Sequence, residues 1–182
     1  IVVDIDSWGG SAVAGEEIAQ ALKDAEKPTV AWVRDAAVSA AYWAASGADY
    51  IVASAMSEIG GIGINGSYLD NVEQNKLEGL TYNQLTSAKF KDSGDPNRKM
   101  TAEEIAIWER DMAIMHEHFV NELSKNRGLE LEKVRELADG STMMGQMAFD
   151  NGLIDEVGGW DEVFDYIQTQ VDVKDDDSVC WY

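Results

Sequence analysis

Short apolar runs alternate with helical patterns through the first half of the chain, and this alternation limits the possible folds more than any other feature. Apolar runs bounded by turn residues are typical of strands, and apolar spacings of three and four are typical of helices. The predicted strands are Ile1–Ile5, Thr29–Arg34, Tyr50–Ala53 and Ile62–Ile64. The predicted helices are 11–25 and 39–47. The first of these helices has Ile18, Ala21, Leu22 and Ala25 on one face. Such alternation indicates parallel β units with right-handed crossovers.

The second half of the chain is predicted to be mainly helical. Thr101 and Glu104 form a capping box, and Gly128 is the expected end of the long helix that follows. Its apolar residues predict one buried face: Ile105, Trp108, Met112, Met115, Phe119 and Leu123. Shorter helices are predicted at Leu131–Ala138 and Asp161–Gln170. We therefore expect a single α/β domain over residues 1–171 with a helical C-terminal extension, followed by an acidic, solvated tail over 172–182.

The charge balance restricts the possible partners. The chain has 14 Lys and Arg against 34 Asp and Glu, a net charge of −20 and a pI of about 4.2. A broad phosphate-binding surface is not expected, so no nucleic-acid partner is predicted. No segment approaches the ~20 uninterrupted apolar residues that cross a bilayer, so no membrane span is predicted in this chain.

The chain begins at Ile1, inside an apolar run and without an initiator Met. We therefore expect a processed product or an excised core that lacks its native N-terminus, where a signal peptide or membrane anchor would lie. The single cysteine, Cys180, allows no internal disulfide. The compartment stays open between the cytoplasm, a membrane reached through the missing segment, and a phage procapsid.

Gly9 and Gly10 form a turn between the first predicted strand and the first predicted helix. Paired glycines permit backbone conformations in which two amides point at one anion, and the helix adds its positive N-terminal end. Such a turn suits a phosphate or the oxyanion of acyl transfer. A third spaced glycine is missing, so nucleotide binding has little support. In the alternative interpretation, the glycines only let the helix pack close to the strand.

Ser39 stands at the junction of a predicted strand and the Ala-rich helix. A nucleophilic serine needs this arrangement, because the N-terminal amides of the helix help to hold the oxyanion. An ordinary helix N-cap is the other interpretation, and serines fill that role very often.

The sequence restricts the base that such a nucleophile could use. His116 and His118 are two residues apart on the long helix, point about 200° away from each other and cannot share a metal. Surface or packing roles suit them, which disfavours a Ser–His–Asp triad. A lysine works as base when burial keeps its amine neutral near pH 7. Lys89 and Lys91 flank Phe90, and if that stretch is extended both face the same side, so spacing alone does not choose between them.

Four motifs in this order resemble the SppA-type signal peptide peptidases, a family that includes phage and prophage head-maturation proteases. They are Asp6-Ser7-Trp8-Gly9-Gly10, Ala37-Val38-Ser39-Ala40-Ala41-Tyr42-Trp43, Gly60-Gly61-Ile62-Gly63, and Phe90-Lys91-Asp92 with Pro96. The stretch Gly152–Gly159 is similar to the C-terminal motif of the family. The likeness covers residues 1 to about 167.

The resemblance implies a Clp/crotonase-like fold, built as a ββα superhelix, and a serine protease with a Ser–Lys dyad. Ser39 matches the family's nucleophile and Lys91 its general base, which selects Lys91 over Lys89. The family's oxyanion hole corresponds to the backbone amides of Gly9, Gly10 and Ala40. Family members form homo-oligomeric rings in which a neighbouring subunit can supply the lysine.

Three positions differ from the family pattern. Trp8 replaces a proline, and Ala40-Ala41 replaces Gly-Gly. Gly61 replaces a serine that in many relatives hydrogen-bonds the lysine. The orientation of Lys91 then falls to water, to Ser57 or to another subunit.

The predicted function is that of a serine endopeptidase acting on signal-peptide remnants or phage structural proteins, through an acyl-enzyme and with no cofactor or metal. Two other classes are considered. A catalytically degenerate member would act in assembly or as a scaffold. A crotonase-type acyl-CoA enzyme would share the fold, but a chain with a charge of −20 offers few basic residues to a phosphate-rich ligand.

Overall fold

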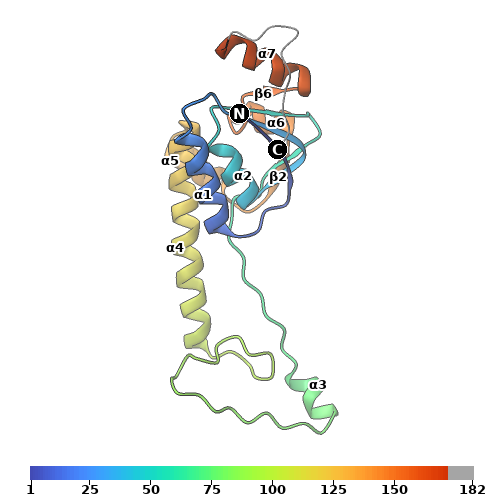
Figure 1. The fold of residues 1–182 in the computed structure, drawn as a ribbon. Helices are drawn as coiled ribbons and strands as arrows, with labels where there is room; N and C mark the ends of the chain where they lie inside the picture. Colours follow the sequence, from blue (N-terminus) through green and yellow to red (C-terminus); the bar gives the residue numbers. More distant parts are fainter. Residues whose placement is uncertain (172–182) are drawn as a thin grey trace. The chain divides into compact units, whose positions relative to one another are not determined.

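The computed structural model describes residues 1–171, which form two compact units; the predicted acidic tail lies outside the described residues. The first unit contains residues 1–63 and 118–171, and the second contains residues 64–117. The sheet of the first unit consists of β1 (Val2–Ser7), β2 (Val30–Val38), β3 (Tyr50–Ala53), β4 (Glu58–Gly60), β5 (Thr142–Met144) and β6 (Glu156–Val157). The helices are α1 (Ala12–Lys23), α2 (Ala40–Ser46), α3 (Val72–Leu77), α4 (Ala102–Arg127), α5 (Leu131–Leu137), α6 (Gly145–Asp150) and α7 (Trp160–Gln170) (Figure 1).

β2 is the centre of the sheet. Its neighbours β1, β3 and β4 all run parallel to it, β6 runs parallel to β3, and only β5 is antiparallel, next to β4. The predicted parallel β units are therefore confirmed. The register of β1 against β2 shifts between Ile5 and Ser7, so the end of β1 bends as it leaves the sheet.

The predicted strand Ile62–Ile64 is wrong. The strand in this region is β4, and the chain leaves the sheet at Gly60 and Gly61, where φ is +102° and +59°. Left-handed backbone of this kind ends a strand, and glycine adopts it without steric penalty. The alternating pattern Ile-Gly-Ile does not reveal that change of direction.

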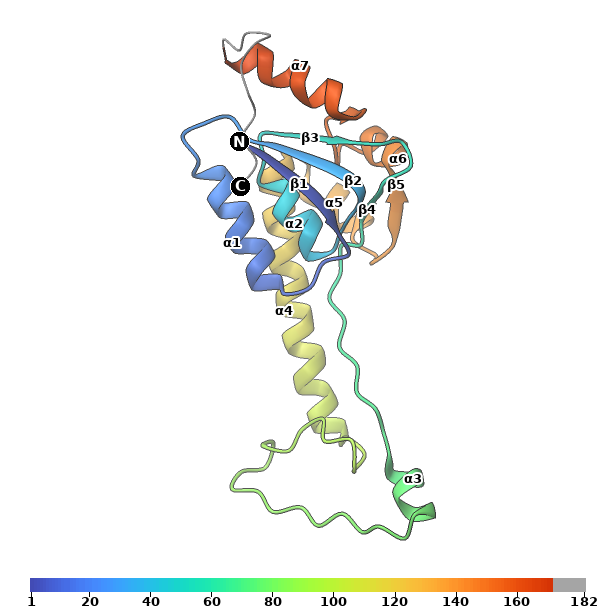
Figure 2. The same cartoon turned by 45° about the vertical axis from the view of Figure 1, so that its right-hand side comes forward.

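Helices cover both faces of the sheet of the first unit (Figure 2). On one face, α7 packs with Val163 against Val30 and Val52 of the central strands. The ring pairs Trp32–Trp160 and Tyr50–Tyr166 flank this core at centroid distances of 5.2 and 4.0 Å. α1 and α2 lie on the opposite face.

α1 and α2 pack at backbone contact because glycines face the neighbouring helix. A Cβ on Gly15 would lie 2.5 Å from the carbonyl oxygen of Ala40, and one on Gly47 would lie 2.2 Å from that of Ala19. The buried residues of α1 are Gly15, Ala19 and Leu22. The predicted face is therefore confirmed at Leu22 and wrong at Ile18 and Ala21, which are exposed. The close approach rotates α1 so that its smallest residues, rather than its largest, meet α2.

α4 begins with the predicted capping box. The Thr101 amide donates to Glu104 Oε2 at 2.8 Å, and the Glu104 amide donates to Thr101 Oγ1 at 3.3 Å. The predicted buried face is confirmed only at Phe119 and Leu123, which belong to the first unit, while Ile105 and Met115 of the second unit are exposed. The second unit has no sheet among its described residues, so too few neighbouring residues are available to bury the apolar face of the N-terminal half of α4.

Candidate active site

Ser39 occupies the tight turn between β2 and α2. Its φ is +57° and its ψ is −126°, and it is the only non-glycine residue with positive φ among residues 1–171. Its side chain makes no capping hydrogen bond to α2, although it stands at the N-cap position. The hydroxyl of an ordinary N-cap serine accepts a hydrogen bond from a backbone amide in the first turn of the helix. The geometry of Ser39 therefore does not support the cap interpretation. A strained serine with a hydroxyl not committed to a cap is the arrangement of a nucleophile elbow.

The backbone around Ser39 is fixed by hydrogen bonds to its own amide and carbonyl. The Ser39 amide donates to the carbonyl oxygen of Gly60 at 2.7 Å, and its carbonyl accepts from the Trp43 amide at 3.0 Å. These contacts tie the turn to β4 on one side and to the first turn of α2 on the other. The unfavourable φ is therefore maintained by the structure around it.

The Gly9-Gly10 turn lies directly against this elbow. A Cβ on Gly9 would be 2.9 Å from Ser39 Cβ and 3.0 Å from the Ala40 nitrogen, so only a glycine fits. The glycine pair therefore does more than let α1 approach a strand, because it also lets the β1 turn reach the serine.

Three amides of this region differ in their availability. The Gly9 amide donates to Ser7 Oγ at 3.2 Å, a contact that the sequence reasoning did not include. The amides of Gly10 and Ala40 donate to no other group among the described residues. The free donors next to Ser39 are thus those of Gly10 and Ala40. The hydroxyl of Ser7 holds the turn in place through Gly9.

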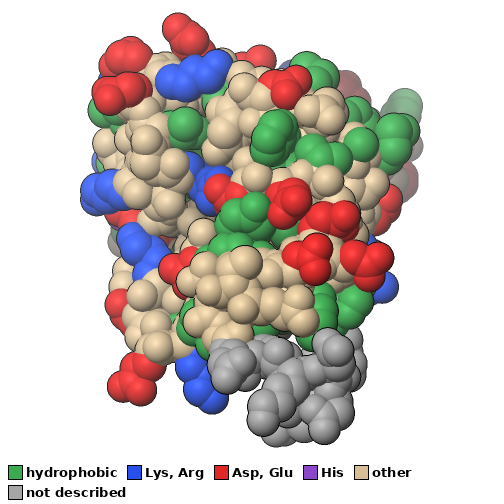
Figure 3. All heavy atoms as spheres, turned by 90° about the horizontal axis from the view of Figure 1, so that it is seen from above, with side chains coloured by type: hydrophobic (Ala, Val, Ile, Leu, Met, Phe, Trp, Pro, Cys, Tyr) green, Lys and Arg blue, Asp and Glu red, His purple; other side chains and the backbone are tan. Residues whose placement is uncertain are grey.

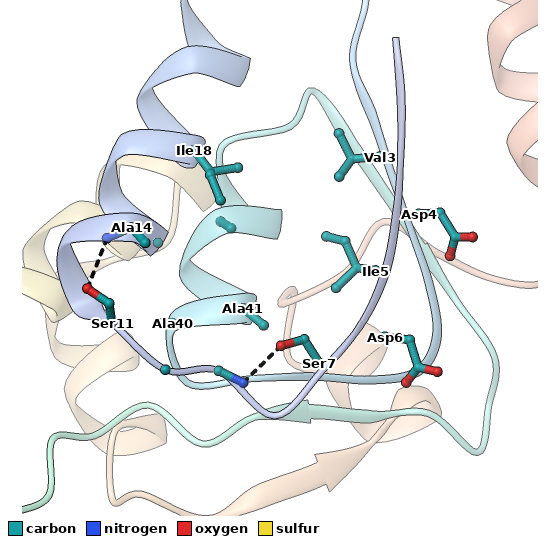
Figure 4. Close-up of a pocket in the computed structure, with 14 residues that line it drawn as sticks. Val3, Asp4, Ile5, Asp6, Ser7, Ser11, Ala14, Ile18, Ala40 and Ala41 are labelled. Carbon is teal, nitrogen blue, oxygen red and sulfur yellow. Dashed lines mark hydrogen bonds between the residues drawn. The ribbon is translucent and has the colours of Figure 1, made fainter. Parts of the chain in front are cut away.

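A pocket of about 320 Å³ opens beside the elbow, between β1 and the pair α1 and α2. Val3, Ile5 and Ser7 point into it from β1, whereas Asp4 and Asp6 point away (Figure 4). The remaining lining comes from the glycine turn and the two helices: Gly9, Gly10, Ser11, Ala14, Gly15, Ile18, Ala40, Ala41 and Ala44. Every side chain on the helical wall is small or aliphatic apart from Ser11, which caps α1 through the Ala14 amide. The pocket can therefore hold an apolar group next to the Gly9-Gly10 turn and Ala40, the residue that follows Ser39.

Both histidines have packing or surface roles. The His118 ring lies edge-on to Trp43 at a centroid distance of 5.6 Å, and its Nε2 is 2.7 Å from Glu16 Oε1. His118 is exposed, as predicted, and His116 is half-buried on the part of α4 that belongs to the second unit. No group of three His, Cys, Asp or Glu side chains suited to a metal occurs within residues 1–171.

Lys89 and Lys91 both belong to the second unit, where they lie in a series of turns rather than in an extended segment. Lys89 forms an ion pair with Glu103, and its ammonium lies 5.0 Å from the Phe90 ring centroid. Lys91 is exposed, and its ammonium has no carboxylate partner within residues 1–171.

The hydroxyl of Ser57 is not available to orient a lysine. Ser57 is buried, and its Oγ donates to the carbonyl oxygen of Arg34 on β2. At position 61 the glycine fits its surroundings closely, because a Cβ there would lie 2.5 Å from Val38 Cγ1. A serine at this position would need both a shift of Val38 and a left-handed backbone.

The surface around the fold is acidic, as the composition requires. On the face drawn in Figure 3, acidic side chains lie among hydrophobic ones, with the basic ones mainly along one edge. No helix within residues 1–171 has the length and apolar character to span a bilayer.

Known protein families, proteins and structures are similar to this chain. The model of Peptidase family S49 matches residues 21–174. Protease 4 of Haemophilus influenzae is 28% identical over an alignment of 184 positions, which covers 98% of this chain and 29% of that protein. The chloroplastic serine protease SPPA of Arabidopsis thaliana is 28% identical over 161 residues, covering 87% of this chain and 24% of that protein.

A protein of Methanocaldococcus jannaschii with a provisional protease name is 29% identical over 181 residues, 98% of this chain and 58% of its own length. The chain thus spans less than two thirds of each of these relatives. Among solved structures, a ClpP1 point mutant from Listeria monocytogenes matches 87% of this chain and 73% of its own, with a TM-score of 0.57 and 15% identity. At that identity the likeness concerns the fold alone, which is the Clp/crotonase-like fold.

Proposed function

Because this chain belongs to peptidase family S49, the SppA-type family, we propose that it is a serine endopeptidase that acts through Ser39 and Lys91. The observation that carries the proposal is the backbone of Ser39, with φ at +57° and a hydroxyl that caps no helix. Strain of this kind costs of order 1–3 kcal/mol, and it is retained where a function needs it.

The proposed reaction has two steps. The neutral amine of Lys91 accepts the Ser39 proton as Oγ attacks a peptide carbonyl, and the amides of Gly10 and Ala40 stabilise the oxyanion. The protonated amine then gives its proton to the departing peptide nitrogen. In the second step Lys91 takes a proton from water, the hydroxide attacks the ester, and the proton returns to Ser39 as the acid product leaves.

Lys91 lies in the second compact unit, so it would serve Ser39 of its own chain or of a neighbouring copy in a ring. The ion pair of Lys89 with Glu103 supports Lys91 over Lys89, because the ammonium of Lys89 is already held by a carboxylate. The proposal requires that the assembled site bury the amine, because burial favours the neutral form of a lysine.

The substrate class follows from the pocket beside Ser39. An aliphatic cavity of about 320 Å³ suits a small or aliphatic side chain next to the scissile bond. Unfolded protein segments and remnants of signal peptides are rich in such side chains, and phage structural proteins remain a second source. The outward orientation of Asp4 and Asp6 keeps charge out of the cavity.

The test uses a fluorophosphonate probe and peptide hydrolysis on the assembled oligomer. Ser39→Ala should lose labelling and turnover, and Lys91→Ala should lower kcat by about 10³-fold or more, while Lys89→Ala keeps activity. Circular dichroism should show an unchanged fold in all three. Normal turnover in either of the first two variants would overturn the proposal.

A scaffold role is the second candidate, and the observation that favours it is Gly61. At this position the serine that orients the lysine in many relatives would need both a shift of Val38 and a left-handed backbone. A correctly assembled wild-type oligomer that no fluorophosphonate labels would establish this alternative.

A further inference from the structure

The segment that carries Lys91 has little structure of its own. Between residues 78 and 101 the chain forms turns and contains neither helix nor strand. Around Lys91 the backbone bonds are those of isolated turns, from the Lys91 amide to the carbonyl of Ala88 at 3.2 Å and from Ser93 to Phe90 at 3.3 Å. Such turns fray readily unless other groups hold them. The position of the lysine therefore depends on side chains elsewhere.

Arg98 supplies that restraint from one side. Its Nη2 donates to the carbonyl oxygen of Asp92 at 2.6 Å, and its Nε donates to Asp92 Oδ2 at 3.0 Å. Asp92 directly follows Lys91, so both the backbone and the side chain next to the lysine are fixed. Tyr82 adds a third contact, because its hydroxyl donates to Asp92 Oδ2 at 2.8 Å.

Arg98 is in turn held by Glu104 at the start of α4. Its Nη1 donates to Glu104 Oε2 at 2.8 Å, and its Nη2 donates to Glu104 Oε1. The Glu104 side chain is only 2% exposed, and it also accepts from the amide and hydroxyl of Thr101 at 2.8 and 3.0 Å. A buried carboxylate at a capped helix end is a rigid anchor.

We propose that Arg98 is the positioning residue of Lys91: its guanidinium joins the N-terminus of α4 to the Lys91–Asp92 backbone and so fixes the point from which the lysine reaches Ser39. The inference rests on the proposed Ser39–Lys91 function. The lysine stem has four flexible carbons, so a fixed Cα is what limits where the amine can go. A planar fork that binds a carboxylate and a carbonyl together can do this, whereas an ammonium group provides no such geometry.

The variant Arg98→Lys tests this, because it keeps the charge and removes the fork. We expect kcat/KM to fall by about tenfold, with KM nearly unchanged, since misplacing a catalytic group by an ångström is costly. The acidic limb of the kcat/KM profile should also move to higher pH, because an amine that spends more time in water is harder to deprotonate. Loss of folded protein alone lowers activity equally at all pH values above about 4.5, where Glu104 makes its full contribution to stability, and leaves the limb in place.

The variant substitutes none of the other charged side chains in this part of the chain, which are Lys89, Asp92, Asp95, Glu103 and Glu104. Tyr82→Phe provides a second variant that removes a single exposed hydrogen bond to Asp92, and a smaller shift in the same direction is expected. The matched control is Arg110→Lys, because Arg110 is an exposed arginine of the same unit that forms an ion pair with Asp111. It should behave as the wild type.

The outcomes separate the two proposals. If Lys91→Ala is inactive while Arg98→Lys and Tyr82→Phe keep the wild-type limb, the dyad stands and the positioning role is wrong. If Lys91→Ala keeps full activity, both are wrong. If Arg98→Lys does not fold, the pH profile of kcat/KM for Tyr82→Phe decides. A shift of its acidic limb to higher pH supports the proposal, and an unchanged acidic limb overturns it.

Discussion

Gly9 lies so close to Ser39 that a Cβ added to Gly9 would be 2.9 Å from the Ser39 Cβ. The two residues follow neighbouring parallel strands, β1 and β2, whose ends meet at the same edge of the sheet. The added atom would also be 2.7 Å from the carbonyl oxygen of Val38, and φ of Gly9 is +99°. The glycine turn and the strained serine are therefore coupled through backbone atoms that no side chain can replace.

Gly9→Ala should accordingly lower both stability and activity. The new methyl group must displace either the β1 turn or the Ser39 elbow, and the alanine is strained at this φ, so the free energy of unfolding should fall by about 1–3 kcal/mol. Fluorophosphonate labelling should fall by more than the loss of folded protein explains, because the amide of Gly10 moves with the turn. Urea unfolding and the labelling rate per folded molecule measure the two effects.

Gly79→Ala is the matched control for the backbone strain. Its φ is +72°, and a Cβ there would meet nothing within 4 Å. We expect a loss of ~1 kcal/mol and unchanged labelling. Equal effects of the two substitutions on labelling would show that the contact between Gly9 and Ser39 has no functional importance.

Ser39→Ala and Ser11→Ala should have opposite effects on stability and activity. Ser11 is a true N-cap, whose Oγ accepts from the Ala14 amide at 3.4 Å, so its loss should cost ~1 kcal/mol. Ser39 caps nothing, so Ser39→Ala should leave the urea midpoint unchanged while it abolishes peptide cleavage. A midpoint that falls as far as in Ser11→Ala would restore the capping interpretation of Ser39.

Ile18→Trp should alter the specificity of the pocket without altering the reaction. Ile18 lines the cavity from α1 and is 47% exposed, so a larger ring can fill the space without disturbing the core. We expect kcat/KM to fall by about 10–100-fold for a peptide with leucine next to the cleaved bond, and little for alanine. Val13→Trp is the control, because Val13 is an exposed residue of α1 outside the pocket. It should leave the ratio of kcat/KM between the leucine and the alanine peptide unchanged. If Ile18→Trp does not change the ratio of kcat/KM between the leucine and the alanine peptide, the substrate side chain binds outside this pocket.

Sequence reasoning located the serine side of the candidate site because local signals mark it. The glycine pair and Ser39 each stand at a strand–helix junction, and neighbouring parallel strands bring such junctions together. Ser7 was missed as a partner of Gly9, although the alternation Val3, Ile5, Ser7 along β1 could have indicated the face that points into the pocket.

Other features depend on tertiary contacts that no local pattern reports. Ile18 fits a helical apolar face, but Gly15 brings α1 so close to α2 that the buried face rotates away from it. Lys91 carries no local signal that distinguishes it from Lys89, because the pairing of Lys89 with Glu103 appears only in the folded unit. The choice of Lys91 came from family resemblance and remains a prediction.

The ion pair between Arg98 and Glu104 predicts a loss of stability in acid. The guanidinium, followed by the Thr101 amide, lowers the pKa of Glu104 from its ordinary 4.5 to about 2. The carboxylate therefore stabilises the fold above about pH 4.5, and this contribution is lost as the pH falls toward 2. Glu104→Gln keeps a capping side chain but lacks the charge, so it should be less stable than wild type at pH 6, and the difference should close toward pH 2.

Urea midpoints measured between pH 2 and 7 test this prediction, with Glu73→Gln as the control. Glu73 also has a lowered pKa through its ion pair with Lys76, but its side chain is 73% exposed. Exposed pairs contribute little because water screens them, so the midpoint of Glu73→Gln should follow the wild type across the range. A gap between wild type and Glu104→Gln that stays constant down to pH 2 would mean that Glu104 contributes as a helix cap alone, because a cap formed by the neutral amide or acid does not depend on the charge of the carboxylate.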